Sequence, residues 1–157
     1  MSETSLRNTK TRFQLLLATV GGIGFIPHAP GTIGSAVALV ILWFVATLPL
    51  LVEVVLFLGL FFLGVWASGS VEDDSVDRDP GYIIIDEFMG MWMAVFFIPT
   101  STAGFLFAFL FFRIFDIVKP APIDRLQQLK GGWGIMLDDI LAGLFAGIIV
   151  LIGTFIL

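Results

Sequence analysis

Residues 33–70, IGSAVALVILWFVATLPLLVEVVLFLGLFFLGVWASGS, decide the fold, and Glu53 is the only charged residue among them. A transmembrane helix needs about 20 apolar residues. This stretch therefore predicts two helices, Ile33–Val52 and Val54–Ser70, joined by a tight connection at Pro49–Glu53. The whole chain of 157 residues is 58% hydrophobic and 13% charged, whereas soluble domains average about 45–50% and about 25%. Because a soluble domain of this length could not hide so much apolar surface, the surrounding solvent is predicted to be largely lipid.

Three further apolar stretches extend the pattern: Phe88–Ile98, Ala103–Val118 and Ile140–Leu157. Phe88–Ile98 approaches spanning length only if Tyr82–Ile85 continue it. In lipid the backbone must pair within helices or a closed barrel, and no ten-residue alternation typical of a barrel occurs. The sequence predicts an all-α, polytopic membrane helical bundle with about five transmembrane helices, built as a single domain over residues 1–157. Residues 13–32, interrupted by glycines, are predicted to form an N-terminal interfacial segment.

Charged side chains are predicted to gather on one side of the membrane. With five spans, the connections 49–53 and 99–104 share one side, and every Lys and Arg lies on the other. These basic residues are Arg7, Lys10, Arg12, Arg78, Arg113, Lys119, Arg125 and Lys130. The positive-inside rule places that side in the cytoplasm. The net charge of −5 makes nucleic-acid binding a poor interpretation, and the absence of cysteine excludes thiolate metal sites.

Five carboxylates are predicted to meet at the cytoplasmic helix ends, as metal ligands and catalytic groups. Asp86 and Glu87 stand among Ile and Phe residues, where an unpaired carboxylate costs several kcal/mol. The helix dipole alone could stabilise such a pair, but it explains these apolar neighbours poorly. Asp116 belongs to a second helix, and Asp138 and Asp139 are predicted to open the last span. Carboxylate clusters without His or Cys suit hard divalent cations, chiefly Mg²⁺.

Cations beside these acids predict phosphate binding. Arg113 and Asp116 are three residues apart and share a helical face, so an internal ion pair would also account for both. Lys119 follows near the helix C-terminus, where a cation suits the dipole. Arg125 and Lys130 are further candidates. Carboxylates and cations that converge at the membrane boundary suit a phosphorylated lipid.

The loop PHAPGTIGS, residues 27–35, is a candidate anion site. Gly31 permits close backbone approach, and Thr32 or Ser35 could cap the following helix and leave N–H groups for an anion. A capped helix start without a ligand explains the loop equally well.

Two other functions stay open from the residues alone. Intramembrane acids also mark ion-coupled transporters, although a transporter needs a midplane site and these charges lie at helix ends. A phospholipid head-group transferase would pair metal carboxylates with lipid phosphate and release no free phosphate.

Four motifs resemble those of the phosphatidylglycerophosphatase A family, bacterial membrane enzymes that dephosphorylate phosphatidylglycerol phosphate. The motifs are PHAPGTIGS, DPGYIIIDEFMGMW, FRIFDIVKPAPI and GGWGIMLDDILAG, in that order. The resemblance implies a Mg²⁺-dependent phosphomonoesterase that produces phosphatidylglycerol and inorganic phosphate at the cytoplasmic face of the bacterial inner membrane. It implies catalytic and metal-binding roles for Asp86, Glu87, Asp116, Asp138 and Asp139. It implies substrate contacts for Arg113, Lys119, Gly31, Thr32 and Ser35.

Overall fold

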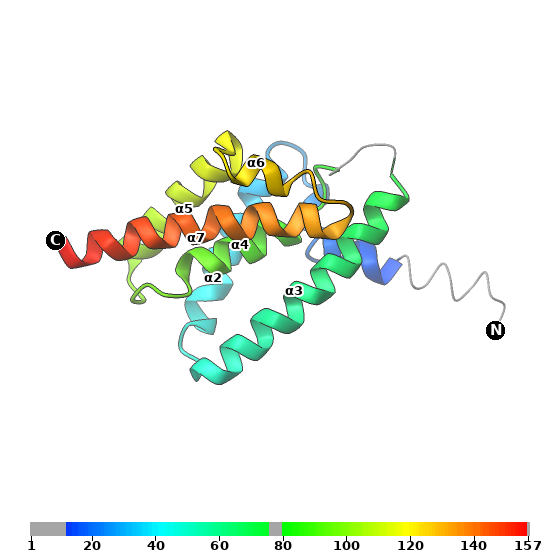
Figure 1. Cartoon of the computed structure of the whole chain (residues 1–157). Coiled ribbons are helices and arrows are strands. Elements are labelled where there is room, and N and C mark those ends of the chain that lie inside the picture. Colours follow the sequence, from blue (N-terminus) through cyan, green and yellow to red (C-terminus); the bar gives the residue numbers. More distant parts are fainter. Residues whose placement is uncertain (1–11, 76–79, 157) are drawn as a thin grey trace.

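The computed structural model describes residues 12–75 and 80–156, which form helices and connections without a strand. After a short helical segment at residues 12–18, the elements are η1 (Ile23–Phe25), α2 (Pro30–Val45), α3 (Leu50–Asp73), α4 (Ile85–Val95), α5 (Thr102–Val118), α6 (Ile123–Leu126) and α7 (Gly132–Ile156). In Figure 1, α7 runs the length of the bundle and α3 diverges from it diagonally. The predicted all-α class is confirmed for the described residues. Arg7, Lys10 and Arg78, used above to orient the chain, lie outside them.

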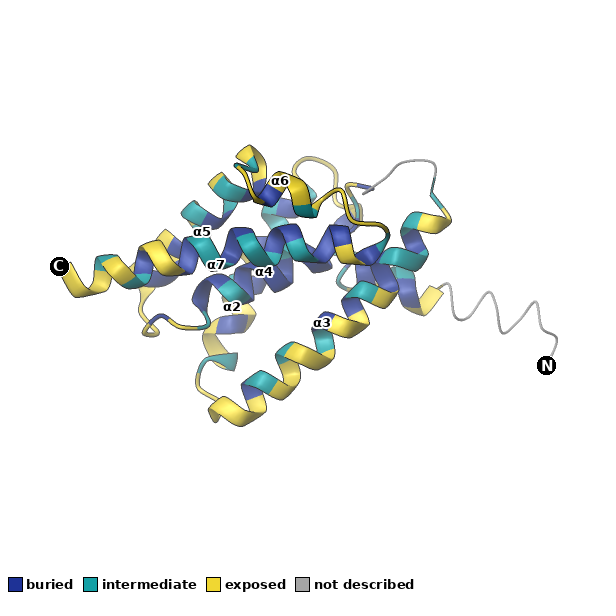
Figure 2. Cartoon of the chain, viewed as in Figure 1, coloured by how far each residue is buried: buried dark blue, intermediate teal, exposed yellow. Residues whose placement is uncertain are grey.

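Two described helices, α3 and α7, are long and apolar enough to cross a membrane. At about 1.5 Å per residue, α2, α5 and α4 measure roughly 24, 26 and 17 Å, against a hydrocarbon core of about 30 Å. The prediction of five spans is therefore not confirmed. Figure 2 shows that much of α3 is exposed, and its exposed side chains include Leu51, Val55 and Phe62. Such an apolar outer face is expected of a helix in lipid.

Helix α4 lies at the centre of the bundle, where its most extensive contacts are with α7. Met89, Met91 and Ala94 are fully buried. Residues 82–84 do not continue this helix, which begins at Ile85, so α4 stays short of spanning length. The preceding residue, Ile84, instead donates its backbone N–H to the carbonyl of Ala18 at 2.9 Å.

The close approach of α4 and α7 depends on small residues. A side chain at Gly143 would overlap the backbone carbonyl of Gly90. Glycine at position 143 therefore lets α4 approach α7 closely. Helix α7 also begins earlier than predicted, because Gly132 packs against the Val65 carbonyl of α3. Asp138 and Asp139 therefore do not open the helix but lie about two turns inside it, fully buried.

Away from the acidic motifs, a buried carboxylate links α3 to α4. The Trp92 indole N–H donates to Glu53 Oε1 at 3.1 Å, and Glu53 is only 8% exposed. In the sequence, Glu53 is distinguished only as the single charged residue of the stretch 33–70. A buried acceptor that loses its donor retains its desolvation cost, about 1–3 kcal/mol.

We expect Trp92→Phe to lower the free energy of unfolding by about that amount, 1–3 kcal/mol. Unfolding in detergent, followed by circular dichroism, measures the change. Trp66→Phe is the matched control, because Trp66 is 46% exposed. Equal stability of the two variants would contradict the role given to this hydrogen bond.

Candidate active site

The predicted acidic residues converge from three helices. Asp86 and Glu87 occupy the first turn of α4, Asp116 lies near the end of α5, and Asp138 and Asp139 belong to α7. All except Glu87, which is half-buried, are buried. Five carboxylates with only two nearby cations leave an excess of negative charge that the described side chains do not balance.

A tight group of three carboxylates forms the centre of the site. One oxygen from each of Asp86, Glu87 and Asp139 lies within 4.8 Å of the others. Glu87 Oε2 and Asp139 Oδ2 are buried and accept no hydrogen bond from any described residue. Like charges held this close resist ionising together unless a cation lies between them. This oxygen-only set of donors fits a hard divalent cation such as Mg²⁺.

Arg113 connects this group to α2 and to the acid on its own helix. Its Nη1 lies 2.6 Å from Asp116 Oδ2 and 3.9 Å from Glu87 Oε1, and it donates to Ser35 Oγ at 3.5 Å. The predicted shared helical face of Arg113 and Asp116 is therefore confirmed. The Nε–H of Arg113 is buried and has no acceptor among the described residues. One strong donor of the guanidinium is thus available to a ligand oxygen.

Lys119 neutralises part of the second acid pair. Its Nζ donates to Asp138 Oδ2 at 2.5 Å and lies 4.0 Å from Asp116 Oδ1. Burial alone would lower the pKa of the ammonium. The hydrogen bond to Asp138 and the negative charges of Asp138, Asp139 and Asp116 together outweigh burial. The pKa of Lys119 is therefore raised above its ordinary value. Lys119 therefore stays positively charged at neutral pH.

The first turn of α2 approaches the acids more closely than its sequence suggests. A Cβ atom at Gly31 would overlap the carboxylate of Glu87, so the gap left by this glycine is filled by the chain's own acid. The predicted capping by Thr32 or Ser35 is wrong. Ala29 is the N-cap residue without a side-chain cap, and the Ser35 hydroxyl lies a turn further on and donates to the Gly31 carbonyl at 2.8 Å.

Three predicted phosphate contacts are not brought into this group. Among the described residues, no hydrogen bond or ion pair joins Thr32 to the acids. Arg125 is exposed on α6, and Lys130 lines a separate polar hollow with Asp124 and Glu72. The sequence could not show that Arg125 and Lys130 lie away from the acids while Arg113 and Lys119 lie beside them. The positions of Arg125 and Lys130 depend on where the chain turns after α5.

Comparison with known protein families gives a match that includes all four sequence motifs. The family model for phosphatidylglycerophosphatase A matches residues 16–154. The chain belongs to this family. The Escherichia coli protein named phosphatidylglycerophosphatase A is 40% identical, over 88% of this chain and 82% of its own. The Haemophilus influenzae protein of that name is 38% identical, over 86% and 85%.

Another relative is also named as a lipid phosphatase, but for a different lipid. A Bacteroides thetaiotaomicron protein, provisionally named a phosphatidylinositol-3-phosphatase, is 35% identical over 91% of this chain and 94% of its own. No solved structure matches the chain. The phosphatidylglycerophosphatase A family is one of phosphatases, so the chain is an enzyme of this type, and its choice of lipid is addressed by the proposal below.

Proposed function

We propose that this protein is a Mg²⁺-dependent phosphatase that hydrolyses phosphatidylglycerol phosphate to phosphatidylglycerol and inorganic phosphate. The observation that carries the proposal is the complementary set of buried atoms lacking hydrogen-bond partners. Among the described residues, two carboxylate oxygens, on Glu87 and Asp139, have no donor and can coordinate a cation, and one guanidinium donor, on Arg113, has no acceptor. A phosphate ester accompanied by a divalent cation supplies both.

The side chains would divide the work as follows. Asp86, Glu87 and Asp139 would hold the cation, and Asp116 and Asp138 would orient Arg113 and Lys119. When bound, Mg²⁺ supplies Lewis-acid stabilisation of the phosphoryl oxygens and lowers the pKa of water. Arg113 and Lys119 would face the phosphate, with Ser35 beside Arg113.

In the overall reaction water adds to phosphorus, the bond from phosphorus to the lipid oxygen breaks, and a proton passes to that oxygen. Arg113 would stabilise the negative charge that develops on the phosphoryl group, from a position where water is largely excluded. Attack by water and attack by a carboxylate to give an aspartyl-phosphate both remain compatible with the site. Acid quenching after a brief reaction with radiolabelled substrate distinguishes them, since only the second leaves label on the protein.

Phosphate release by the purified protein tests the proposal. We expect release from phosphatidylglycerol phosphate in mixed micelles with Mg²⁺, and release at the background rate with a chelator. Phosphatidylinositol 3-phosphate is the comparison substrate because of the name of the Bacteroides relative. Faster hydrolysis of the inositol lipid would overturn the proposed substrate but keep the phosphatase. Ion flux in vesicles without phosphate release would favour a transporter, and head-group exchange without release would favour a transferase.

We further propose that the protein lies in the bacterial inner membrane and that the acidic site faces the cytoplasm. The chain has no cysteine, so single cysteines can report the two sides without background. Thr47 and Asp124 are both exposed, Thr47 between α2 and α3 and Asp124 on α6. In intact spheroplasts, a membrane-impermeant maleimide should label Thr47→Cys, and should label Asp124→Cys only after lysis. The opposite pattern would invert the proposed orientation.

A further inference from the structure

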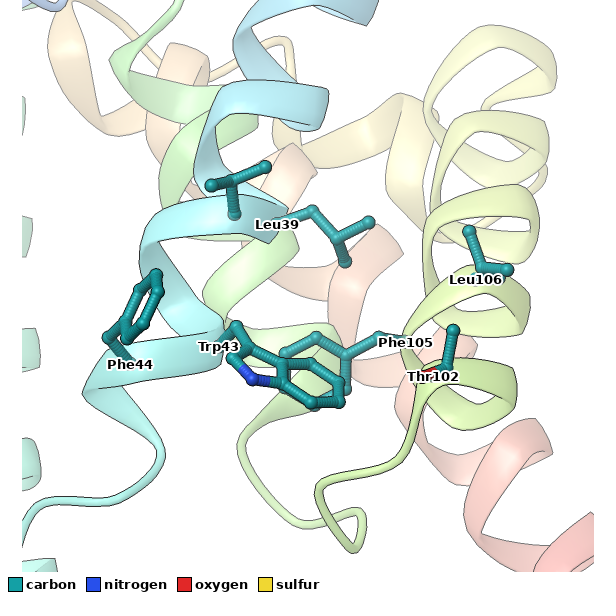
Figure 3. Close-up of a pocket in the computed structure, with 7 residues that line it drawn as sticks. Leu39, Trp43, Phe44, Thr102, Phe105 and Leu106 are labelled. Atoms are coloured by element: carbon teal, nitrogen blue, oxygen red, sulfur yellow. The ribbon is translucent and has the colours of Figure 1, made fainter.

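An apolar groove of about 270 Å³ lies between α2 and α5. Its lining includes Leu39, Trp43 and Phe44 of α2 and Thr102, Phe105 and Leu106 of α5. Figure 3 shows the two helices flanking the space, with Trp43 and Phe105 side by side between them. The groove is open to the surroundings on one side, so in a membrane it faces lipid.

The same two helices carry residues of the candidate active site. Ser35 on α2 and Arg113 on α5 are joined by the hydrogen bond at 3.5 Å. At a rise of about 1.5 Å per residue, Leu39 lies about 6 Å beyond Ser35 along α2. Leu106 lies about 10 Å before Arg113 along α5. The groove therefore leads away from the guanidinium, along the helices that hold it.

The groove has an aromatic base and an open apolar rim. The rings of Trp43 and Phe105 meet edge to face with centroids 5.2 Å apart, and Phe105 is only 2% exposed. Leu106 and Phe44 at the rim are 56% and 69% exposed. An aromatic base with an open apolar rim suits a flexible hydrocarbon chain that enters from the side, because dispersion contacts accumulate along its length.

We infer that this groove holds one acyl chain of the phospholipid whose phosphate binds at Arg113. The inference rests on the proposed function, since it takes the ligand to be a lipid phosphate. The occupant follows from continuity: the donor for a phosphate oxygen and the apolar groove lie in sequence along the same pair of helices. A chain held in the groove would restrict how the phosphate can sit over the carboxylates, and such positioning raises the rate of reaction.

The first test fills the groove. Leu106→Trp adds bulk at the rim, and Leu58→Trp is the matched control, because Leu58 is 48% exposed on α3 and outside the groove. We expect Leu106→Trp to lower kcat/KM for phosphatidylglycerol phosphate about tenfold, or roughly 1.4 kcal/mol. Its kcat/KM for the deacylated, water-soluble head group should match that of the unaltered protein, which also shows that the variant folds. Equal effects of the two tryptophan variants on the lipid substrate would overturn the inference.

The second test locates the chain directly. Phosphatidylglycerol phosphate with brominated acyl chains is added as a minor component of lipid nanodiscs, with a chelator to prevent turnover. Bromine quenches nearby tryptophan, so the unaltered protein should lose more fluorescence than Trp43→Phe. Equal losses would place the chain elsewhere. A dimer in detergent that dissociates in Leu106→Trp, seen by light scattering, would assign the groove to a second copy instead.

The two proposals fail in different ways. If the unaltered protein releases no phosphate from any lipid tested, the proposed function is wrong. If it releases phosphate but Leu106→Trp behaves as Leu58→Trp, only the acyl-chain site is wrong.

Discussion

Replacing Asp139 with asparagine is expected to reduce phosphate release from phosphatidylglycerol phosphate at least about a thousandfold, or roughly 4 kcal/mol of transition-state stabilisation. Asp139 contributes one of the three closely spaced carboxylate oxygens and is only 2% exposed. Asparagine has nearly the same shape, but it removes a negative charge and a strong cation ligand. Initial rates at saturating Mg²⁺ measure the loss.

The thermal stability of Asp139→Asn should not fall together with its activity. Asp139 experiences the charges of Asp116, Glu87 and Asp138, so neutralising it relieves repulsion in the metal-free protein. We expect the thermal midpoint in chelator to stay the same or rise. Asp124→Asn is the control, because Asp124 is exposed on α6 and should tolerate the change in both respects. Near-normal turnover by Asp139→Asn would remove this residue from the proposed metal site.

Gly31→Ala is expected to lower the rate of phosphate release about a hundredfold, although it adds a single methyl group. That methyl group would overlap the Glu87 carboxylate and lie 3.3 Å from Arg113 Nη1. The carboxylate is the movable partner, so the protein should fold with Glu87 displaced from the other ligands. Displacement by about 1 Å of a group that positions the substrate can cost about 10²-fold in rate.

The matched control for this change is Gly59→Ala. Nothing lies within 4 Å of a Cβ at Gly59, and alanine favours the helix there by up to about 1 kcal/mol. Its phosphatase activity should match that of the unaltered protein. A higher Mg²⁺ requirement of Gly31→Ala, read from the rate against Mg²⁺ concentration, would support displacement of a ligand. Unaltered activity and unaltered Mg²⁺ dependence would contradict the close packing of Gly31 on Glu87.

Several features of the chain could be predicted because they follow from composition and short spacing. The excess of apolar residues over 33–70 predicts helices, since backbone groups in lipid must pair within the segment. The three-residue spacing of Arg113 and Asp116 predicts their ion pair, because helical periodicity places them on one face. The four motifs contain the residues that the fold brings together at one end of the bundle.

Other features could not be predicted, because they depend on how the helices meet. The sequence predicts the acids at 138 and 139 at a helix end, but α7 begins at Gly132, where the chain packs against α3, and both acids are buried inside the helix. The start of α4 at Ile85 is preceded by a backbone hydrogen bond from Ile84 to Ala18, which no local pattern indicates. The sequence predicts that five carboxylates act as one set of ligands. The structure separates them by partner, since Asp138 pairs with Lys119 while Asp139 faces the acids of α4.

The sequence by itself therefore determined the helical class and the residues available for chemistry, because these depend on residue types and on spacing within one segment. Only the tertiary structure decided which carboxylates share a site and which are neutralised by a cation. Those pairings depend on the rotation and separation of the helices, which close contacts at Gly31 and Gly143 control. The same packing decided the shape of the groove between α2 and α5, because a hollow is formed by two helices together and by neither alone.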